Sequence, residues 1–268
     1  MHLSELHALL GPVRSAVQEA CDVIQAIRRG AVEGRLKEDE SPVTAADHAA
    51  DALLKERLLE LLPVGWLSEE TADSPERLAQ EALWVVDPLD GTKEFLAGIP
   101  EYSVAVALVR NGRPQLAVVQ NPATGDCFWA TRGGGAFRDD TPIAVRDGAR
   151  LLASRSEIRR GEFAPFMDGW DVVHVGSIEY KLGLVAAGEG AVTLSRGPKW
   201  EWDVCAGALI VEEAGGLATD VFGGQFRFNQ AFPKVKGILA GAPASCARAK
   251  AAIDRLGTSD RMRELTER

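Results

Sequence analysis

The sequence predicts a layered α+β protein with two lobes. Apolar residues recur at helical spacing before residue 63, short β-rich runs punctuated by glycine fill the middle, and strand-like and helix-like segments alternate from about residue 150. Such an order of segments is typical of chains that stack sheets and helices in layers. We expect residues 1–143 to form an N-terminal α+β lobe and residues 144–268 a C-terminal α/β lobe.

Two helices are expected first. Leucine, valine and isoleucine recur at helical spacing over residues 3–27, and Gly30 follows as a stop signal. A second helix should run from near residue 44 to residue 62, because Pro63 cannot continue it.

Short strands and further helices follow. The expected strands of the first lobe are 83–86, 103–109, 116–119 and 127–130. In the second lobe we expect strands over 171–175, 191–194, 217–219 and 237–240, helices over 178–187 and 203–214, and a final helix with a charged tail. Gly215-Gly216 is a helix C-terminal signal, and the lobes should meet near residues 141–147.

The charge balance narrows the class of partner. The chain carries 39 Asp and Glu against 30 Lys and Arg, a formal net charge of −9. This balance argues against binding to a nucleic-acid polymer or an anionic membrane, which need a basic face. A phosphorylated small molecule remains possible, because a metal ion can supply positive charge. No apolar run is long enough to cross a bilayer and no signal-peptide pattern is present, so we expect a cytoplasmic protein without an integral membrane contact.

Cysteine and histidine offer no zinc site. The four cysteines are far apart and form no C-x-x-C pair, so reduced, mostly buried thiols are expected: Cys21, Cys127, Cys205 and Cys246. The four histidines are also scattered, and we expect surface or packing roles for them: His2, His7, His48 and His174.

One stretch carries the strongest chemical signal. A hydrophobic run ends in two carboxylates, Asp87 and Asp90, and opens into Gly91-Thr92. Pro88 stiffens the turn, and Gly91 permits a backbone conformation in which N–H groups approach a ligand closely. A helix beginning there would offer unpaired N–H groups to a phosphate. Because adjacent carboxylates repel a phosphate unless divalent cations lie between them, the stretch indicates metal-bridged phosphate binding, although an acidic surface turn explains this motif taken alone.

Three further segments supply acidic residues. Glu69 and Glu70 stand in an expected loop, and Asp203 precedes an apolar helix. Asp47 lies three residues after Thr44. Taken singly, these are typical of a solvated loop, a helix N-cap and a capping box. Taken together, oxygen ligands select a hard cation, Mg²⁺ first.

Four motifs follow one another in a fixed order: T-x-x-D at 44–47, E-E at 69–70, D-P-L-D-G-T at 87–92 and W-D at 202–203. With this combination the sequence resembles the magnesium-dependent, lithium-sensitive phosphatases of the inositol monophosphatase superfamily over roughly residues 40–220. The resemblance implies their layered αβαβα sugar-phosphatase fold. Residues 91–95, 200–203 and 228–230 are similar to the CysQ branch, the 3′(2′),5′-bisphosphate nucleotidases.

The resemblance also implies residue roles. The ligands of two or three Mg²⁺ ions would be Glu69, Asp87, the backbone carbonyl of Leu89, Asp90 and Asp203. Asp47 and Thr92 would orient and activate the attacking water, with Glu69 near it. The N–H groups of Gly91 and Thr92 would bind the scissile phosphate.

A later segment, Gly176-Ser177 followed by Lys181, matches the part that contacts the rest of the substrate in CysQ-like enzymes. The Lys181 ammonium could meet a second phosphate as a point charge, or it could lie on a solvated helix face. Arg196 stands near the position where inositol monophosphatases carry a glutamate for a substrate hydroxyl, which disfavours inositol monophosphate.

The resulting hypothesis is hydrolysis of a phosphate monoester by in-line attack of a metal-bound water. The preferred substrate is adenosine 3′,5′-bisphosphate or 3′-phosphoadenosine 5′-phosphosulfate, acted on by a monomer or homodimer. Inositol monophosphate or another sugar phosphate is the first alternative. A non-catalytic, magnesium-dependent binding or regulatory protein on the same fold is a second, and an acidic structural protein whose carboxylates cap helices is a third.

Overall fold

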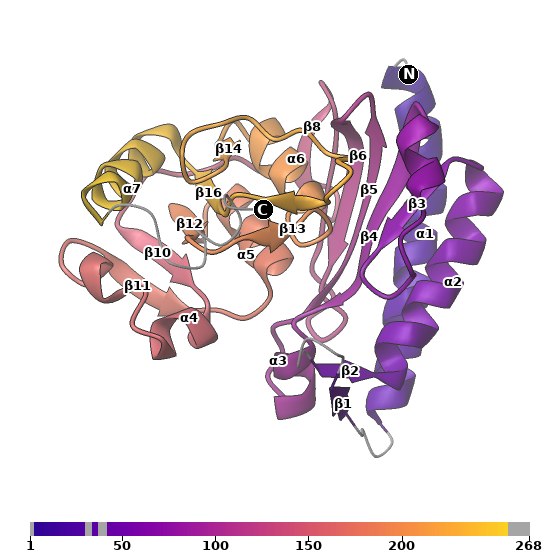
Figure 1. Ribbon diagram of the computed structural model, residues 1–268, viewed down its shortest axis with the longest axis horizontal. Coiled ribbons are helices and arrows are strands. Elements are labelled where there is room, and N and C mark those ends of the chain that lie inside the picture. Colours follow the sequence, from indigo (N-terminus) through magenta and orange to yellow (C-terminus); the bar gives the residue numbers. More distant parts are fainter. Residues whose placement is uncertain (1–2, 30–33, 37–41, 257–268) are drawn as a thin grey trace.

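A computed structural model describes residues 3–29, 34–36 and 42–256. Its helices and sheets stack as five alternating layers, helix, sheet, helix, sheet and helix (Figure 1). This arrangement confirms the layered α+β fold and the αβαβα order.

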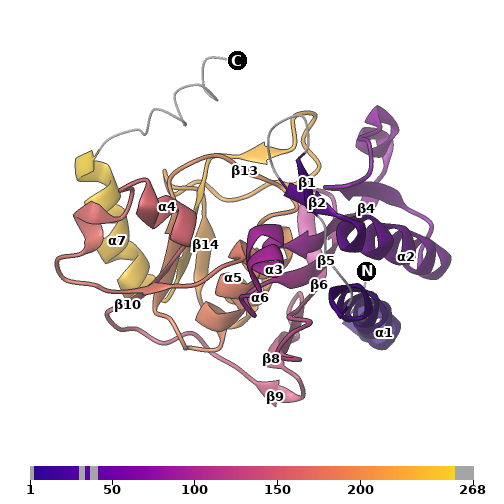
Figure 2. The ribbon, with the colours of Figure 1, turned by 90° about the horizontal axis from the view of Figure 1, so that it is seen from below.

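The first layer is a pair of helices, α1 (Leu3–Arg28) and α2 (Ala45–Leu61). Both present apolar faces to the first sheet, where Val17, Ile24 and Leu54 are buried in one core cluster. Figure 2 shows both helices on one side of this sheet. The two predicted helices are therefore confirmed, while the stop signal at Gly30 lies outside the described residues.

The second layer is a seven-stranded sheet of order β3-β4-β5-β6-β7-β8-β9. Only β3 and β4 pair in parallel; the other neighbours are antiparallel. The strands are β3 (Gly65–Ser68), β4 (Ala82–Asp90), β5 (Ser103–Arg110), β6 (Arg113–Gln120), β7 (Cys127–Thr131), β8 (Gly135–Arg138) and β9 (Thr141–Pro142). The four predicted strands are confirmed, and β3, β8 and β9 were not predicted.

The middle layer consists of α5 (Ile178–Ala186) and α6 (Cys205–Glu213). All nine residues of α5 are buried, because sheets cover these helices from both sides. One core cluster joins Phe128 of the first sheet, Leu182 and Leu209 of the helices, and Ala240 of the second sheet. The predicted helix end at Gly215 is confirmed, since its backbone has a φ of 82° and its N–H donates to Glu212 O at 3.0 Å.

The second sheet has the order β11-β10-β12-β16-β14. Its strands are β10 (Arg150–Ala153), β11 (Asp171–His174), β12 (Val192–Ser195), β14 (Leu217–Thr219) and β16 (Ile238–Gly241). Of these, β10 was not predicted. The fifth layer contains α4 (Arg155–Arg159) and α7 (Pro243–Leu256), which lie on the side of the molecule opposite α1 and α2 (Figure 2).

Smaller elements complete the chain: β1 (Gly34–Leu36), β2 (Pro42–Thr44), η1 (Pro75–Ala79), α3 (Thr92–Ala97), η2 (Ala164–Phe166), β13 (Lys199–Trp200) and β15 (Lys234–Val235). All four cysteines are buried and free of disulfides, as expected. Among the described residues, no helix is long and apolar enough to cross a membrane. The charged tail after Leu256 lies outside the described residues.

The chain passes from the first sheet to the second between Pro142 and Arg150. This passage coincides with the expected boundary near residues 141–147. The core around α5 and α6 nevertheless extends over both sheets, and the division into lobes 1–143 and 144–268 stays a prediction.

Candidate active site

The two carboxylates of the D-P-L-D-G-T motif lie on an irregular end of β4. Asp87 pairs with Ala105 of β5, but Asp90 pairs with Ser103, so three steps on one strand face two on the other. Pro88 lies within this bulge, where a residue without an N–H does not interrupt a regular ladder. The strand therefore continues past its predicted end and turns both acids into the site.

A glycine is required directly after the second acid. Gly91 has a φ of 97°, and a Cβ at this position would lie 3.0 Å from Glu101 O. As the N-cap of α3, it lets the chain turn from the strand into the short helix that begins at Thr92. A helix does begin at Gly91-Thr92, which is the condition under which the sequence offers N–H groups to a phosphate.

Asp47 connects the start of α2 to Thr92. Its Oδ2 accepts hydrogen bonds from Thr44 N at 2.7 Å and Thr44 Oγ1 at 2.6 Å, which confirms the expected capping box. Its Oδ1 accepts from Thr92 Oγ1 at 3.0 Å, and the same hydroxyl lies 3.2 Å from Leu89 O. The structure therefore brings together the pair that the resemblance assigned to orienting water.

Asp87 lies at the centre of a cluster of like charges. It is 1% exposed, and burial raises its pKa well above the ordinary value of an aspartate. The negative charges of four neighbouring carboxylates raise this pKa further: Glu69, Asp90, Asp203 and Glu179. All four predicted acidic ligands thus lie within electrostatic reach of one point.

Asp203 does not cap the helix that follows it, so the N-cap reading of this residue is wrong. Val204 is the N-cap of α6, without a side-chain cap bond, and Asp203 Oδ2 accepts from Trp200 N at 2.8 Å instead. The intervening turn directs this carboxylate away from the helix N–H groups. Burial raises the Asp203 pKa to about 6, while the Lys199 charge opposes the shift.

In three of the predicted ligands, only one of the two carboxylate oxygens accepts a hydrogen bond from the described residues. Among the described residues, hydrogen bonds engage only Oδ1 of Asp87 and only Oδ2 of Asp90 and Asp203. Within the same ranges, no three Asp, Glu, His or Cys side chains are already arranged around a single point as ion ligands. Buried, mutually repelling carboxylates fit a hard divalent cation chemically, and their side chains would have to rearrange to hold one.

The start of α5 holds Asp90. Ser177 is its N-cap, with a φ of 50° that is uncommon for a residue other than glycine. Asp90 Oδ2 accepts from Ser177 Oγ at 2.5 Å and from Glu179 N at 2.7 Å. The structure therefore places the Ser177 hydroxyl, which the resemblance assigned to substrate binding, against a predicted metal ligand.

Gly176 lies one residue earlier, between two glutamates. Its N–H donates to Glu101 Oε2 at 2.6 Å, and a Cβ here would lie 2.4 Å from Glu94 Cγ. Arg155 also donates to the Glu101 carboxylate. This contact of α3 with the α5 start leaves room only for glycine.

Lys181 is 3% exposed, so the expectation of a solvated helix face is wrong. The sequence pattern could not reveal this, because α5 is covered on both sides. Its Nζ donates to Val175 O at a long 3.4 Å, and burial lowers the pKa of the ammonium while the charges of Glu157 and Asp90 oppose that shift.

Two buried acids escaped the sequence reasoning. Glu179 accepts from Ala206 N at 3.1 Å and Gly207 N at 2.5 Å at the start of α6, and burial together with the Asp90 charge raises its pKa well above the ordinary value. Asp51 lies four residues after Asp47, which places both on one face of α2. That spacing was a usable signal for Asp51, whereas nothing in the sequence near Glu179 marked it.

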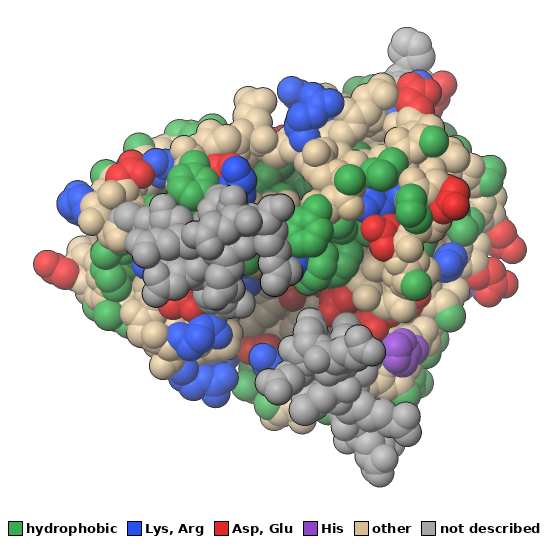
Figure 3. Space-filling model, viewed as in Figure 1, with side chains coloured by type: hydrophobic (Ala, Val, Ile, Leu, Met, Phe, Trp, Pro, Cys, Tyr) green, Lys and Arg blue, Asp and Glu red, His purple; other side chains and the backbone are tan. Residues whose placement is uncertain are grey.

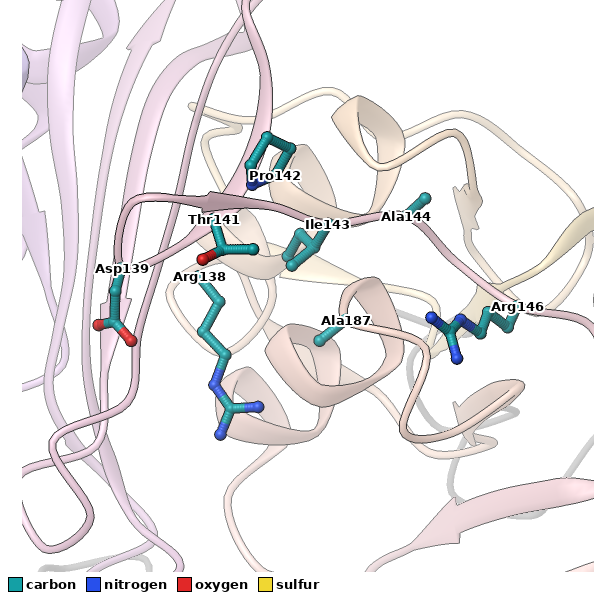
Figure 4. A pocket seen from close by; sticks show the side chains of 8 residues that line it. All are labelled: Arg138, Asp139, Thr141, Pro142, Ile143, Ala144, Arg146 and Ala187. Carbon is teal, nitrogen blue, oxygen red and sulfur yellow. The ribbon is translucent and has the colours of Figure 1, made fainter.

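Figure 3 shows acidic side chains gathered where this face of the molecule is hollowed, next to an apolar patch. A separate pocket of about 570 Å³ contains none of the predicted site residues (Figure 4). There, Arg138 and Arg146 lie on either side of Ala187, and Arg138 pairs with Asp126 at 2.5 Å. The carboxylate cluster around Asp87 is therefore the candidate active site.

Comparison with known proteins finds similar sequences among phosphatases that are named for different substrates. The inositol-1-monophosphatase of Rhizobium meliloti (strain 1021) is 37% identical over 205 residues, covering 68% of this chain and 73% of that protein. The 3′(2′),5′-bisphosphate nucleotidase CysQ of Aggregatibacter actinomycetemcomitans is 31% identical over 234 residues, covering 80% of this chain and 84% of that protein.

The similarity extends to the three-dimensional structure. The inositol monophosphatase of Anabaena (Nostoc) sp. PCC 7120 superimposes with a TM-score of 0.79 at 28% sequence identity, covering 94% of this chain and 97% of that one. The model of the inositol monophosphatase family matches residues 6–256. The protein therefore belongs to the inositol monophosphatase family, a family of phosphatases.

Proposed function

We propose that the protein is a magnesium-dependent phosphate monoester hydrolase whose active site is the carboxylate cluster around Asp87. The observation that carries this proposal is the buried Asp87 carboxylate, which is surrounded by other carboxylates. This carboxylate is linked through the backbone of Leu89 to the hydrogen-bonded pair Asp47 and Thr92. Such a concentration of negative charge is costly unless cations compensate it. A phosphate could then enter because the cations reverse the local charge.

The proposed ligands of two or three Mg²⁺ ions are Glu69, Asp87, the carbonyl of Leu89, Asp90 and Asp203. The bound metal would supply positive charge for the phosphoryl oxygens and lower the pKa of a water. Leu89 lies within the bulge between Asp87 and Asp90, and its carbonyl lies 3.2 Å from the Thr92 hydroxyl.

The chain's own residues would orient the reactants. Asp47 holds the Thr92 hydroxyl, and that hydroxyl would fix the attacking water in line with the phosphorus–oxygen bond that breaks, with Glu69 beside it. The N–H groups of Gly91 and Thr92 would bind the scissile phosphate. Asp47 would act as a positioning group, because its two carboxylate oxygens are held by Thr44 and Thr92.

For the substrate, we propose adenosine 3′,5′-bisphosphate or 3′-phosphoadenosine 5′-phosphosulfate. Similarity to CysQ over 80% of the chain supports this choice, as do the presence of Arg196 near the position of an expected glutamate and the segment Gly176, Ser177 and Lys181. For the Lys181 ammonium to contact a second phosphate, that phosphate would have to reach a side chain that is only 3% exposed.

Inositol monophosphate is the second candidate, favoured by the 37% identity with the Rhizobium meliloti inositol-1-monophosphatase. Phosphate release from adenosine 3′,5′-bisphosphate, the phosphosulfate and inositol 1-phosphate should be compared with magnesium and with chelator. We expect magnesium-dependent release, fastest from the bisphosphate, and inhibition by lithium. Equal or faster release from inositol 1-phosphate would reject the nucleotidase assignment, and release unaffected by chelator would reject the metal mechanism.

A further inference from the structure

Asp51 is a buried carboxylate of α2 that is not one of the predicted site residues. It is 7% exposed in the middle of α2, one helical turn after Asp47. Its Oδ1 accepts from Ser68 Oγ at 2.5 Å, and its Oδ2 accepts from Thr71 Oγ1 at 2.6 Å. Both carboxylate oxygens of this side chain are thus committed to one loop.

The two hydroxyl donors bracket the acidic pair Glu69 and Glu70. Ser68 is the last residue of β3, and its Oγ also lies 3.4 Å from Glu70 N as a weak acceptor. Glu69 N donates to Val86 O of β4 at 3.3 Å. Asp51 therefore fastens the loop on each side of Glu69, whose charge acts on Asp87.

An aspartate at position 51 is unfavourable for the stability of the fold. Aspartate is a poor helix former in a helix interior, and a buried carboxylate loses its hydration. Neighbouring inward positions of the same helix carry Leu54 and Leu58, both fully buried. Hydrogen bonds to an ionised carboxylate are short and strong, so they fix the donors more firmly than neutral ones do.

We infer that Asp51 is a positioning residue that holds the Glu69–Glu70 loop in the geometry required for binding a divalent cation. This inference rests on the proposed function, because it assigns Glu69 to the metal. Through Asp47 and Asp51, one face of α2 then organises both the Thr92 hydroxyl and the glutamate loop. Residues that orient metal ligands typically change metal affinity by about 10–100-fold when they are replaced.

The test compares Asp51→Asn with the wild-type protein. Asparagine keeps the shape but provides one acceptor oxygen instead of two. Magnesium binding is measured by isothermal titration calorimetry without substrate, and the magnesium dependence of turnover is measured separately. We expect magnesium affinity to fall by at least about tenfold, with kcat at saturating magnesium near the wild-type value. Glu60→Gln, which changes a 67% exposed carboxylate on the same helix, is the matched control.

A second variant keeps the inference testable if Asp51→Asn folds poorly. Thr71→Val removes one donor to Asp51 with little change in shape, and we expect it to weaken magnesium binding severalfold in the same assay. If Asp51→Asn does fold, adding Thr71→Val to it should weaken binding by less than the product of the two separate effects.

The outcomes separate this inference from the proposed function. A wild-type protein that binds no magnesium overturns the proposed function and this inference with it. A wild-type protein that binds magnesium, together with Asp51 and Thr71 variants of unchanged affinity, overturns the inference alone. A lowered melting temperature with unchanged magnesium affinity assigns Asp51 a structural role only, and this also overturns the inference.

Discussion

Asp87 and Asp90 show how strongly neighbours decide the role of a residue. They have the same chemistry and lie three residues apart, yet Asp87 is fully buried with its Oδ1 on Leu89 N at 3.0 Å, whereas Asp90 is half-buried and held by the start of α5. The first therefore experiences the greater desolvation. Without cations, the negative charge of Asp87 destabilises the native state.

This contrast predicts opposite effects of one substitution on activity and stability. Asp87→Asn retains the acceptor for Leu89 N but removes a buried charge, so the metal-free protein should melt at the same or a higher temperature. Turnover with magnesium should fall by about 10²–10³-fold, the size of effect seen when one preorganised electrostatic group is lost. Calorimetry in chelator and phosphate release check the two halves, and near-normal turnover would contradict the assignment.

The buried acids also predict a pH dependence. Burial raises the Asp203 pKa to about 6 and the Glu201 pKa to about 7. The native state then binds more protons than the unfolded state between about pH 4 and 7, so the free energy of unfolding falls as pH rises through that window. Melting temperatures measured in chelator should decrease from pH 5 to pH 7.5, and magnesium should diminish the decrease. A metal-free protein that becomes more stable over this range would refute the argument.

At the scale of elements, regular periodicity made most of the structure predictable. The helix over residues 3–28 and the strand over 103–110 carry long repeating patterns, and both were placed within two residues. By contrast, β3 and β10 have four residues each and take their stability from neighbouring strands. The burial of Lys181 and the turn that redirects Asp203 depend on the packing of α5 and α6, which no local pattern encodes.

The candidate site was predictable to a similar extent. Three of the four motifs identified acidic residues that the fold brings within electrostatic reach of one another around Asp87, although Glu69 and Asp203 are more than 100 positions apart in the chain. The fourth motif supplied Asp47, which the fold joins to Thr92. The sequence did not reveal that Ser177 directs its hydroxyl to Asp90, because this contact depends on a positive φ at the start of α5. Motifs therefore named the groups, and tertiary packing assigned their partners.

The contact between α3 and the start of α5 gives a prediction for Gly176→Ala. The added methyl would lie 2.4 Å from Glu94 Cγ and 2.8 Å from Glu101 O, so the start of α5 must shift. We expect a loss of about 1–3 kcal/mol in stability, together with reduced turnover, because Ser177 and Glu179 would no longer hold Asp90 in place. Chemical denaturation and kinetics measure both effects. Gly148→Ala is the control: this exposed glycine also lacks a positive φ, and the added methyl would meet only Ala191 Cβ at an ordinary 3.7 Å.

At the scale of the whole molecule, the site lies where elements from several layers end. The bulge of β4 supplies Asp87 and Asp90, the start of α2 supplies Asp47, and the turn before α6 supplies Asp203. Each element is held by a large apolar core on its far side. The layers thus oppose the mutual repulsion of the acids and keep them together.

A cation bound at this junction should therefore stabilise the entire fold. If magnesium binds only the native state, a free concentration of 100 times its Kd adds about 2.7 kcal/mol, which corresponds to a rise of about 5–10 °C in melting temperature for a chain of this size. Asp203 joins the site from the second half of the chain, so Asp203→Asn should abolish most of this rise in melting temperature. Asp254→Asn, on the exposed side of α7, should leave the rise unchanged. Differential scanning calorimetry with and without magnesium provides the measurement. An equal rise in the Asp203 variant would mean that the stabilising ion binds elsewhere, since the carboxylate that the turn before α6 contributes would then be dispensable.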